Sequence, residues 1–168
     1  MMRILAFDPG YAITGWGIVE DPPLRAIAFG AITTPAAEKP ERRLFKILEA
    51  SRGLIREHKP EAVVVETLFV NKNAKTAGGV YEARGVILAA IGESQLELIS
   101  LGPGTIKKAV TGNGQAKKNA VHTMVQKLLG ISHAIRPDDT ADALAGAIAG
   151  LFAAKRNLVQ KRIRSVLK

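Results

Sequence analysis

Cysteine is absent from the 168 residues, which excludes a disulfide framework and a thiolate metal site. No apolar run reaches the roughly 18 residues that a membrane span requires. The N-terminus has no basic segment followed by a long apolar stretch, so we expect neither a signal peptide nor a membrane anchor. Internal repeats, low-complexity segments and clear linkers are also missing. These absences predict a cytoplasmic protein built around one hydrophobic core.

Acidic residues are scarce in the second part of the chain. Residues 1–97 carry equal numbers of basic and acidic side chains, whereas residues 98–168 carry only three acids, Asp138, Asp139 and Asp142. The entire net charge of +9 therefore belongs to the second part. A one-sided basic surface favours a polyanionic partner such as nucleic acid. A basic surface that serves only solubility fits the same composition.

The hydrophobic pattern predicts an α/β domain with a mixed five-stranded sheet flanked by helices. Gly10 permits a turn between the first two strands, and the sequence Gly-Pro-Gly at 102–104 predicts another turn. Strands are expected at residues 3–8, 14–20, 25–33, 62–65 and 96–100. Helices are expected at residues 41–58, 74–91, 105–111, 116–129 and 138–156.

Two of these strands end in an acid: Asp8 follows the apolar run ILAF, and Glu66 follows AVVV. Functional groups of open α/β sheets gather beyond the carboxyl ends of the strands, so neighbouring strands would bring these two carboxylates together. Asp139 and Asp142 lie three residues apart at the start of the last predicted helix and share one of its faces. Asp138 is an alternative to Asp139, because an i,i+4 pair with Asp142 also shares a face.

Four carboxylates at one place would repel each other unless a cation lay between them. Ligation by oxygen alone suits Mg²⁺ or Mn²⁺, and two such ions can stabilise both the attacking water and the leaving oxygen at a phosphate. Each acid also fits a simpler role: turn initiation for Asp8, a strand-end ion pair for Glu66 and helix capping for Asp139. The combination, in an otherwise basic protein, favours a metal site.

Five motifs in a fixed order resemble the RNase H-like nucleases and, within them, the RuvC family of Holliday-junction resolvases. The resemblance covers residues 3 to about 150. The motifs are FDPGYAITGWGIV, VVVETLFVNKNAKTA, YEARGV, IKKAVTGNGQAKKNAV and PDDTADALAGAIA.

The resemblance implies an endonuclease that resolves four-way DNA junctions in recombination and repair, leaving 5′-phosphate and 3′-hydroxyl ends. Asp8, Glu66, Asp139 and Asp142 would be the catalytic ligands of two Mg²⁺ ions, with Mn²⁺ as an alternative. A homodimer would cut two strands symmetrically, with the small-residue helix at 74–91 helping to build it. The branch-migration proteins RuvA and RuvB are the implied protein partners.

Basic and aromatic positions near the motifs receive a DNA-binding role by the same resemblance. Lys107 and Lys118 would approach the scissile phosphate and add positive charge there. Phe69 would stack on an unpaired base, with Lys72 and Asn73 beside it at the DNA. From the residues alone, a solvated helix face for the lysines and core packing for Phe69 are alternatives.

The C-terminal segment carries no family motif. We expect a nuclease domain at residues 1–156 followed by a basic tail at 157–168. A helix and a frayed arm both fit the tail, and so do DNA contact and a solubilising surface.

Other functions fit parts of the sequence. Actin-like and sugar-kinase ATPases also have Asp-x-Gly after the first strand, but they need a second lobe for which 168 residues leave no room. Another nuclease or strand-transfer enzyme of the same fold, and a junction-binding protein without catalysis, are the remaining alternatives. Loss of cutting without loss of DNA binding in Asp8→Asn would separate an enzyme from a binding protein.

Overall fold

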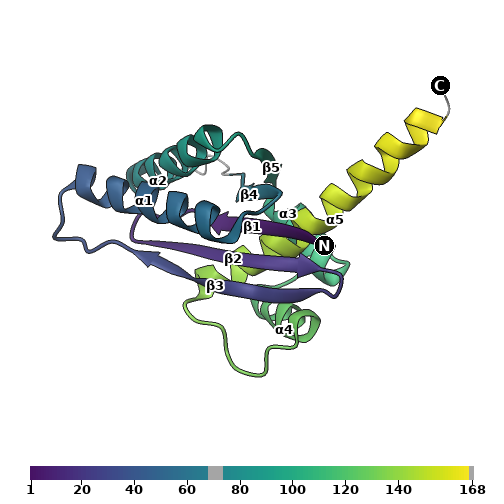
Figure 1. Ribbon diagram of the computed structural model, residues 1–168. Helices are drawn as coiled ribbons and strands as arrows, with labels where there is room; N and C mark the ends of the chain where they lie inside the picture. The colour runs from purple at the N-terminus through teal and green to yellow at the C-terminus, as the bar shows by residue number, and fades with distance from the viewer. Residues whose placement is uncertain (68–73, 167–168) are drawn as a thin grey trace.

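The structure is a computed structural model that describes residues 1–67 and 74–166. A five-stranded sheet in the order β3-β2-β1-β4-β5 forms its centre, with helices on both faces (Figure 1). The strands are β1 (Met2–Asp8), β2 (Ile13–Asp21), β3 (Arg25–Thr33), β4 (Ala62–Glu66) and β5 (Glu97–Leu101). The helices are α1 (Pro40–His58), α2 (Ala74–Glu93), α3 (Pro103–Thr111), α4 (Lys118–Leu129) and α5 (Asp138–Val166).

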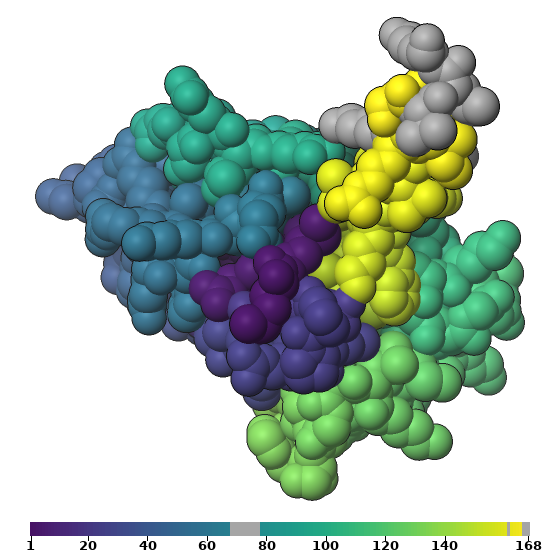
Figure 2. All heavy atoms as spheres, turned by 45° about the vertical axis from the view of Figure 1, so that its right-hand side comes forward, coloured from purple at the N-terminus to yellow at the C-terminus, as the bar shows by residue number. Residues whose placement is uncertain are grey.

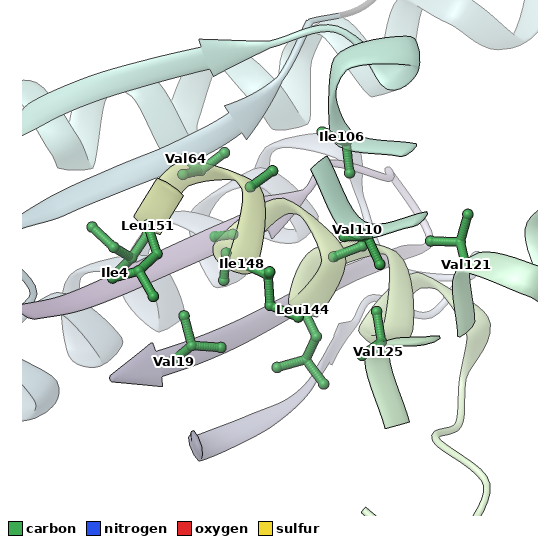
Figure 3. Packing of buried hydrophobic residues seen from close by; sticks show 14 of the residues in the cluster. Ile4, Val19, Val64, Ile106, Val110, Val121, Val125, Leu144, Ile148 and Leu151 are labelled. Carbon is green, nitrogen blue, oxygen red and sulfur yellow. The ribbon is translucent and has the colours of Figure 1, made fainter. Parts of the chain in front are cut away.

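The alternation of side chains along β1 divides the core into two layers. Leu5 and Phe7 point to the face that α1 and α2 cover, whereas Ile4 and Ala6 point to the face that α5 covers. Both layers are closed to water, as expected for a central strand buried on both sides. Figure 3 shows the second layer, where apolar side chains of α3 and α4 meet the α5 side chains. This packing fixes α3 and α4 relative to α5.

Strand pairing brings the two strand-end acids to the same edge of the sheet. β1 is antiparallel to β2 and parallel to β4, and β4 is parallel to β5, so the predicted mixed sheet is confirmed. Phe7 of β1 lies opposite Val65 of β4. Asp8 and Glu66 are the next residues on these parallel strands, so both carboxylates leave the sheet at neighbouring positions.

The start of α5 lies very close to the sheet because glycine faces it. A Cβ atom on Gly15 of β2 would overlap the backbone carbonyl of Asp139, and a Cβ on Gly17 would press on Leu144. The hydroxyl of Thr140 donates a hydrogen bond of 3.0 Å to the carbonyl of Gly30 on β3. These contacts hold the start of α5, which carries Asp138 and Asp139 in its first turn and Asp142 just after it, against the carboxyl-terminal half of β1 and its neighbours.

Several helix boundaries differ from the sequence-based expectation by a few residues or more, and two of these differences have a clear cause. The turn predicted at 102–104 is the start of α3, because Pro103 occupies the first helical turn, where its missing N–H costs nothing. The last helix continues to Val166 instead of ending at 156, because no glycine or proline interrupts it. The C-terminal part of α5 that is drawn in yellow in Figure 2 stands away from the body of the molecule. Among residues 1–67 and 74–166, no helix is both long and apolar enough to cross a membrane.

Candidate active site

The turn after β1 places Asp8 at the edge of the sheet. Gly10 is required in this turn, since a Cβ there would collide with the carbonyl of Ile13. The hydroxyl of Thr14 donates a hydrogen bond of 2.7 Å to the carbonyl of Gly10 and closes the turn. Arg43 of α1 supports the same loop from outside, with its guanidinium 3.8 Å from the centre of the Tyr11 ring. The residues around Asp8 are therefore anchored at several points.

Asp8 lies in a strongly unfavourable environment for a negative charge. The pKa of its carboxyl is raised to about 8, mainly by burial and then by the negative charges of Glu66, Asp142 and Asp139, in that order. The positive charge of Lys118 acts in the opposite direction. Glu66 of β4 and Asp139 and Asp142 of α5 thus lie within electrostatic reach of Asp8, as the sequence predicted.

Glu66 shares this environment at the end of β4. Burial is the main cause that raises the pKa of its carboxyl, and the charge of Asp142 adds to the effect. Lys107 of α3 lowers the pKa of the same carboxyl, so the ammonium group lies near enough to act on Glu66. The structure therefore brings this predicted lysine to the acids.

Asp142 on α5 is held by two side chains of α4. Lys118 Nζ lies 2.8 Å from Asp142 Oδ2, and this hydrogen-bonded pair raises the pKa of the lysine. His122 Nε2 donates a hydrogen bond of 2.8 Å to Asp142 Oδ1. His122 was not among the residues predicted from the sequence. Its position one turn after Lys118 on a helix, with a shared face, is the signal that was available for it.

The acid doublet at the start of α5 separates into two environments. Asp138 forms an ion pair of 2.6 Å with Arg136 and lies 3.7 Å from Lys118. Asp139, but not Asp138, is among the charges that raise the pKa of Asp8. The geometry therefore favours Asp139 as the partner of Asp8 and gives Asp138 a surface ion pair.

A cleft of about 190 Å³ opens beside these acids. Four chain segments contribute its charged lining: β4, α3, α4 and α5. Its charged residues are Glu66, Lys107, Lys118 and Asp142. Acidic and basic groups thus face one space, which suits a ligand that carries negative charge and is bound together with a cation.

The donor set of carboxylate oxygens fits a hard divalent cation. Carboxylate oxygens are the preferred ligands of Mg²⁺ and Mn²⁺, and a cation would relieve the repulsion that raises the pKa of Asp8. Within residues 1–67 and 74–166, no three acidic or histidine side chains already surround a single metal position. Both oxygens of Asp142 already have partners, since Oδ2 contacts Lys118 and Oδ1 contacts His122.

Three predicted DNA-binding residues, Phe69, Lys72 and Asn73, lie outside the described residues.

Fold and site together define an RNase H-like protein, in which acids from the first strand, the fourth strand and the last helix meet at one edge of a mixed sheet. The family model for the crossover junction endodeoxyribonuclease RuvC matches residues 4–150. The chain belongs to this RuvC family of endodeoxyribonucleases.

Individual relatives agree with this assignment. The crossover junction endodeoxyribonuclease RuvC of Moorella thermoacetica is 49% identical over 149 residues, which cover 88% of this chain and 89% of that protein. Its counterpart in Carboxydothermus hydrogenoformans is 46% identical, covering 90% and 96%. Among solved structures, T. thermophilus RuvC in complex with a Holliday junction substrate matches with a TM-score of 0.89 and 31% identity, covering 94% of this chain and 97% of the other.

Proposed function

We propose that this endonuclease resolves four-way DNA junctions at the cleft between β4, α3, α4 and α5, acting as a homodimer in the cytoplasm during recombination and repair. Asp8, Glu66, Asp139 and Asp142 would hold two Mg²⁺ ions, or Mn²⁺ in their place. Such ions, when bound, activate a water molecule for attack on a phosphodiester and stabilise the leaving oxygen. The products are a 5′-phosphate and a 3′-hydroxyl.

One observation carries this proposal: acids and lysines from four elements line a single cleft. A metal site that served only stability would not need lysines at its open side. A site that only bound phosphate would not need acids, which repel phosphate unless a cation lies between them. The mixture of both therefore favours chemistry on a phosphodiester.

Each side chain has a separate task in the proposal. The four carboxylates would hold the cations, which supply the chemistry at the phosphate when bound. Lys107 and Lys118 supply positive charge next to the phosphate, where negative charge increases in the transition state. Lys118 Nζ pairs with Asp142 Oδ2 at 2.8 Å, and it would exchange this contact for the phosphate.

A homodimer through α2 is part of the proposal. Gly78 and Gly85 lie seven residues apart on one face of α2, and a Cβ on either would meet open space. Tyr81, between them in the sequence, is an exposed aromatic side chain. Small residues permit the close approach of a second helix, and a two-fold dimer offers two equivalent sites to a four-way junction. RuvA and RuvB are proposed as partners on the basis of family membership.

A cleavage assay on defined DNA tests the proposed function. Purified protein is incubated with a labelled four-way junction and with a linear duplex of matching sequence, in Mg²⁺, in Mn²⁺ and in EDTA. We expect cuts confined to the junction, at symmetric positions on two strands, that require metal and leave ends that a ligase seals. Binding of the junction without cutting in either metal would instead support a junction-binding protein.

Replacing Lys118→Ala tests the role of this lysine at the phosphate. We expect single-turnover cleavage of bound junction to slow by about 100-fold, because a positive charge beside the reacting phosphate is lost. Junction affinity should fall much less, since one phosphate contact among several is removed. Lys117→Ala is the matched control, because Lys117 is the preceding exposed residue and caps the same helix. If junction affinity is lost while the cleavage rate of bound junction is unchanged, Lys118 contributes only to DNA binding.

A further inference from the structure

Asp142 lies between two hollows of the surface. It lines the catalytic cleft together with Glu66 and Lys118. His122 does not line that cleft but a neighbouring groove of about 340 Å³, which Thr123 and Asp138 also line. The hydrogen bond from His122 Nε2 to Asp142 Oδ1 connects a residue of the groove with a residue of the cleft. His122 therefore reaches Asp142 from the side of the groove, and the acid faces the cleft.

We infer that His122 is a positioning residue that orients the Asp142 carboxylate for metal binding. The inference rests on the proposed function, in which Asp142 is a metal ligand. His122 itself touches neither the cleft nor the reacting atoms. Its N–H holds Oδ1, so that Oδ2 is the oxygen presented to the cleft once Lys118 has moved to the phosphate. Ligating carboxylates of metal sites commonly have such an outer hydrogen-bond partner.

The two partners of Asp142 differ in how firmly they are placed. The Lys118 side chain is 51% exposed, whereas the His122 side chain is 17% exposed. Lysine has four rotatable side-chain bonds, but histidine has two and loses less freedom when it is fixed. The preceding residue, Val121, is buried against the α5 layer (Figure 3), as is Val125 one turn later. His122 is thus the fixed partner, and Lys118 is the partner free to exchange.

Substitutions at position 122 distinguish the effect of the hydrogen bond from the effect of filling the space that the ring occupies. His122→Leu removes the donor, His122→Gln retains an N–H at a similar reach, and His122→Asn retains the polarity on a shorter side chain. Thr123→Ala is the matched control, because Thr123 lines the same groove on the same helix. Mn²⁺ affinity is measured by calorimetry on the DNA-free full chain, and cleavage by single turnover at saturating junction. Melting temperature in EDTA verifies that each variant folds.

We expect His122→Leu to weaken Mn²⁺ binding by at least about tenfold and to slow cleavage at limiting Mn²⁺ while junction affinity in EDTA is unchanged. His122→Gln should retain most of the Mn²⁺ affinity and most of the cleavage rate of the parent, and His122→Asn should retain neither. If His122→Leu does not fold, the difference between Gln and Asn provides the same test. Equal Mn²⁺ affinity in the parent, the position-122 variants and Thr123→Ala would overturn the inference.

Asp142→Asn distinguishes this inference from the proposed function. If Asp142→Asn loses Mn²⁺ binding and cleavage while the His122 variants behave like the parent, the positioning role alone is wrong. If Asp142→Asn retains both, the proposed metal site itself is wrong.

Discussion

Asp8→Asn is expected to abolish junction cleavage and, at the same time, to stabilise the metal-free protein. Loss of one ligand from a metal site that stabilises the transition state by several kcal/mol corresponds to a rate reduction of at least about 1,000-fold. In EDTA the same change removes a charge that burial and three other acids disfavour. A residue whose function and stability conflict in this way is typical of an active site.

The gain in stability depends on pH with a defined sign. In the folded protein the pKa of the Asp8 carboxyl is raised to about 8 from its ordinary value of 3.8. Between these values the folded protein binds more protons than the unfolded chain, so the free energy of unfolding falls as pH rises. Asn has no such titration. The stabilisation by Asp8→Asn should therefore be small at pH 4 and greatest above pH 8.

Thermal unfolding in EDTA measures this effect. Each unit of pKa shift corresponds to about 1.4 kcal/mol of unfolding free energy. Because Asp8 is partly exposed, the stabilisation is smaller than the full pKa shift would give. We expect a gain of about 2 kcal/mol at pH 8.5, or a melting temperature about 5 °C higher. Glu38→Gln, which removes an exposed acid, is the control and should show no comparable gain. A clear drop in the melting temperature of Asp8→Asn would contradict the clustering of the acids.

Asp139→Asn and Asp138→Asn are expected to differ by orders of magnitude in cleavage. Asp139 acts on Asp8 within the acid cluster, so its loss should reduce the rate about 1,000-fold. Asp138 pairs with Arg136, whose side chain is 75% exposed, and exposed ion pairs contribute about 0–1 kcal/mol. Its loss should change the rate only a few-fold.

Single-turnover rates of both variants at saturating Mg²⁺ provide the comparison. The two substitutions remove the same charge from adjacent residues of one helix, so each is the other's control. Equal losses of rate would mean that the doublet acts only through its total charge. A larger loss in Asp138→Asn would reverse the proposed assignment of ligands.

Much of the fold and of the acid cluster was predictable because the responsible signals are local. The buried runs before Asp8 and Glu66 mark two strand ends, and parallel strands bring their carboxyl ends together. The three-residue spacing of the family motif favoured Asp139 over Asp138, but helix periodicity alone did not separate them, since both share a helix face with Asp142. The choice depends on how α5 is rotated against the sheet, which Gly15 and Gly17 control by contacts distant in sequence.

The contact between His122 and Asp142 could not be predicted for a similar reason. The two residues are twenty positions apart, and their meeting depends on the packing of α4 against α5. Apolar side chains such as Val121 and Leu144 set that packing in three dimensions. Periodicity can place His122 on the face of Lys118, but it cannot say what that face touches.

Anomalous diffraction from crystals of the protein soaked in Mn²⁺ would locate the metal ions. We expect anomalous peaks within ligand distance of Asp8, Glu66, Asp139 and Asp142, with Lys118 displaced from Asp142. Absence of peaks there at saturating Mn²⁺, or peaks bound only by other residues, would contradict a metal site at the ends of β1 and β4.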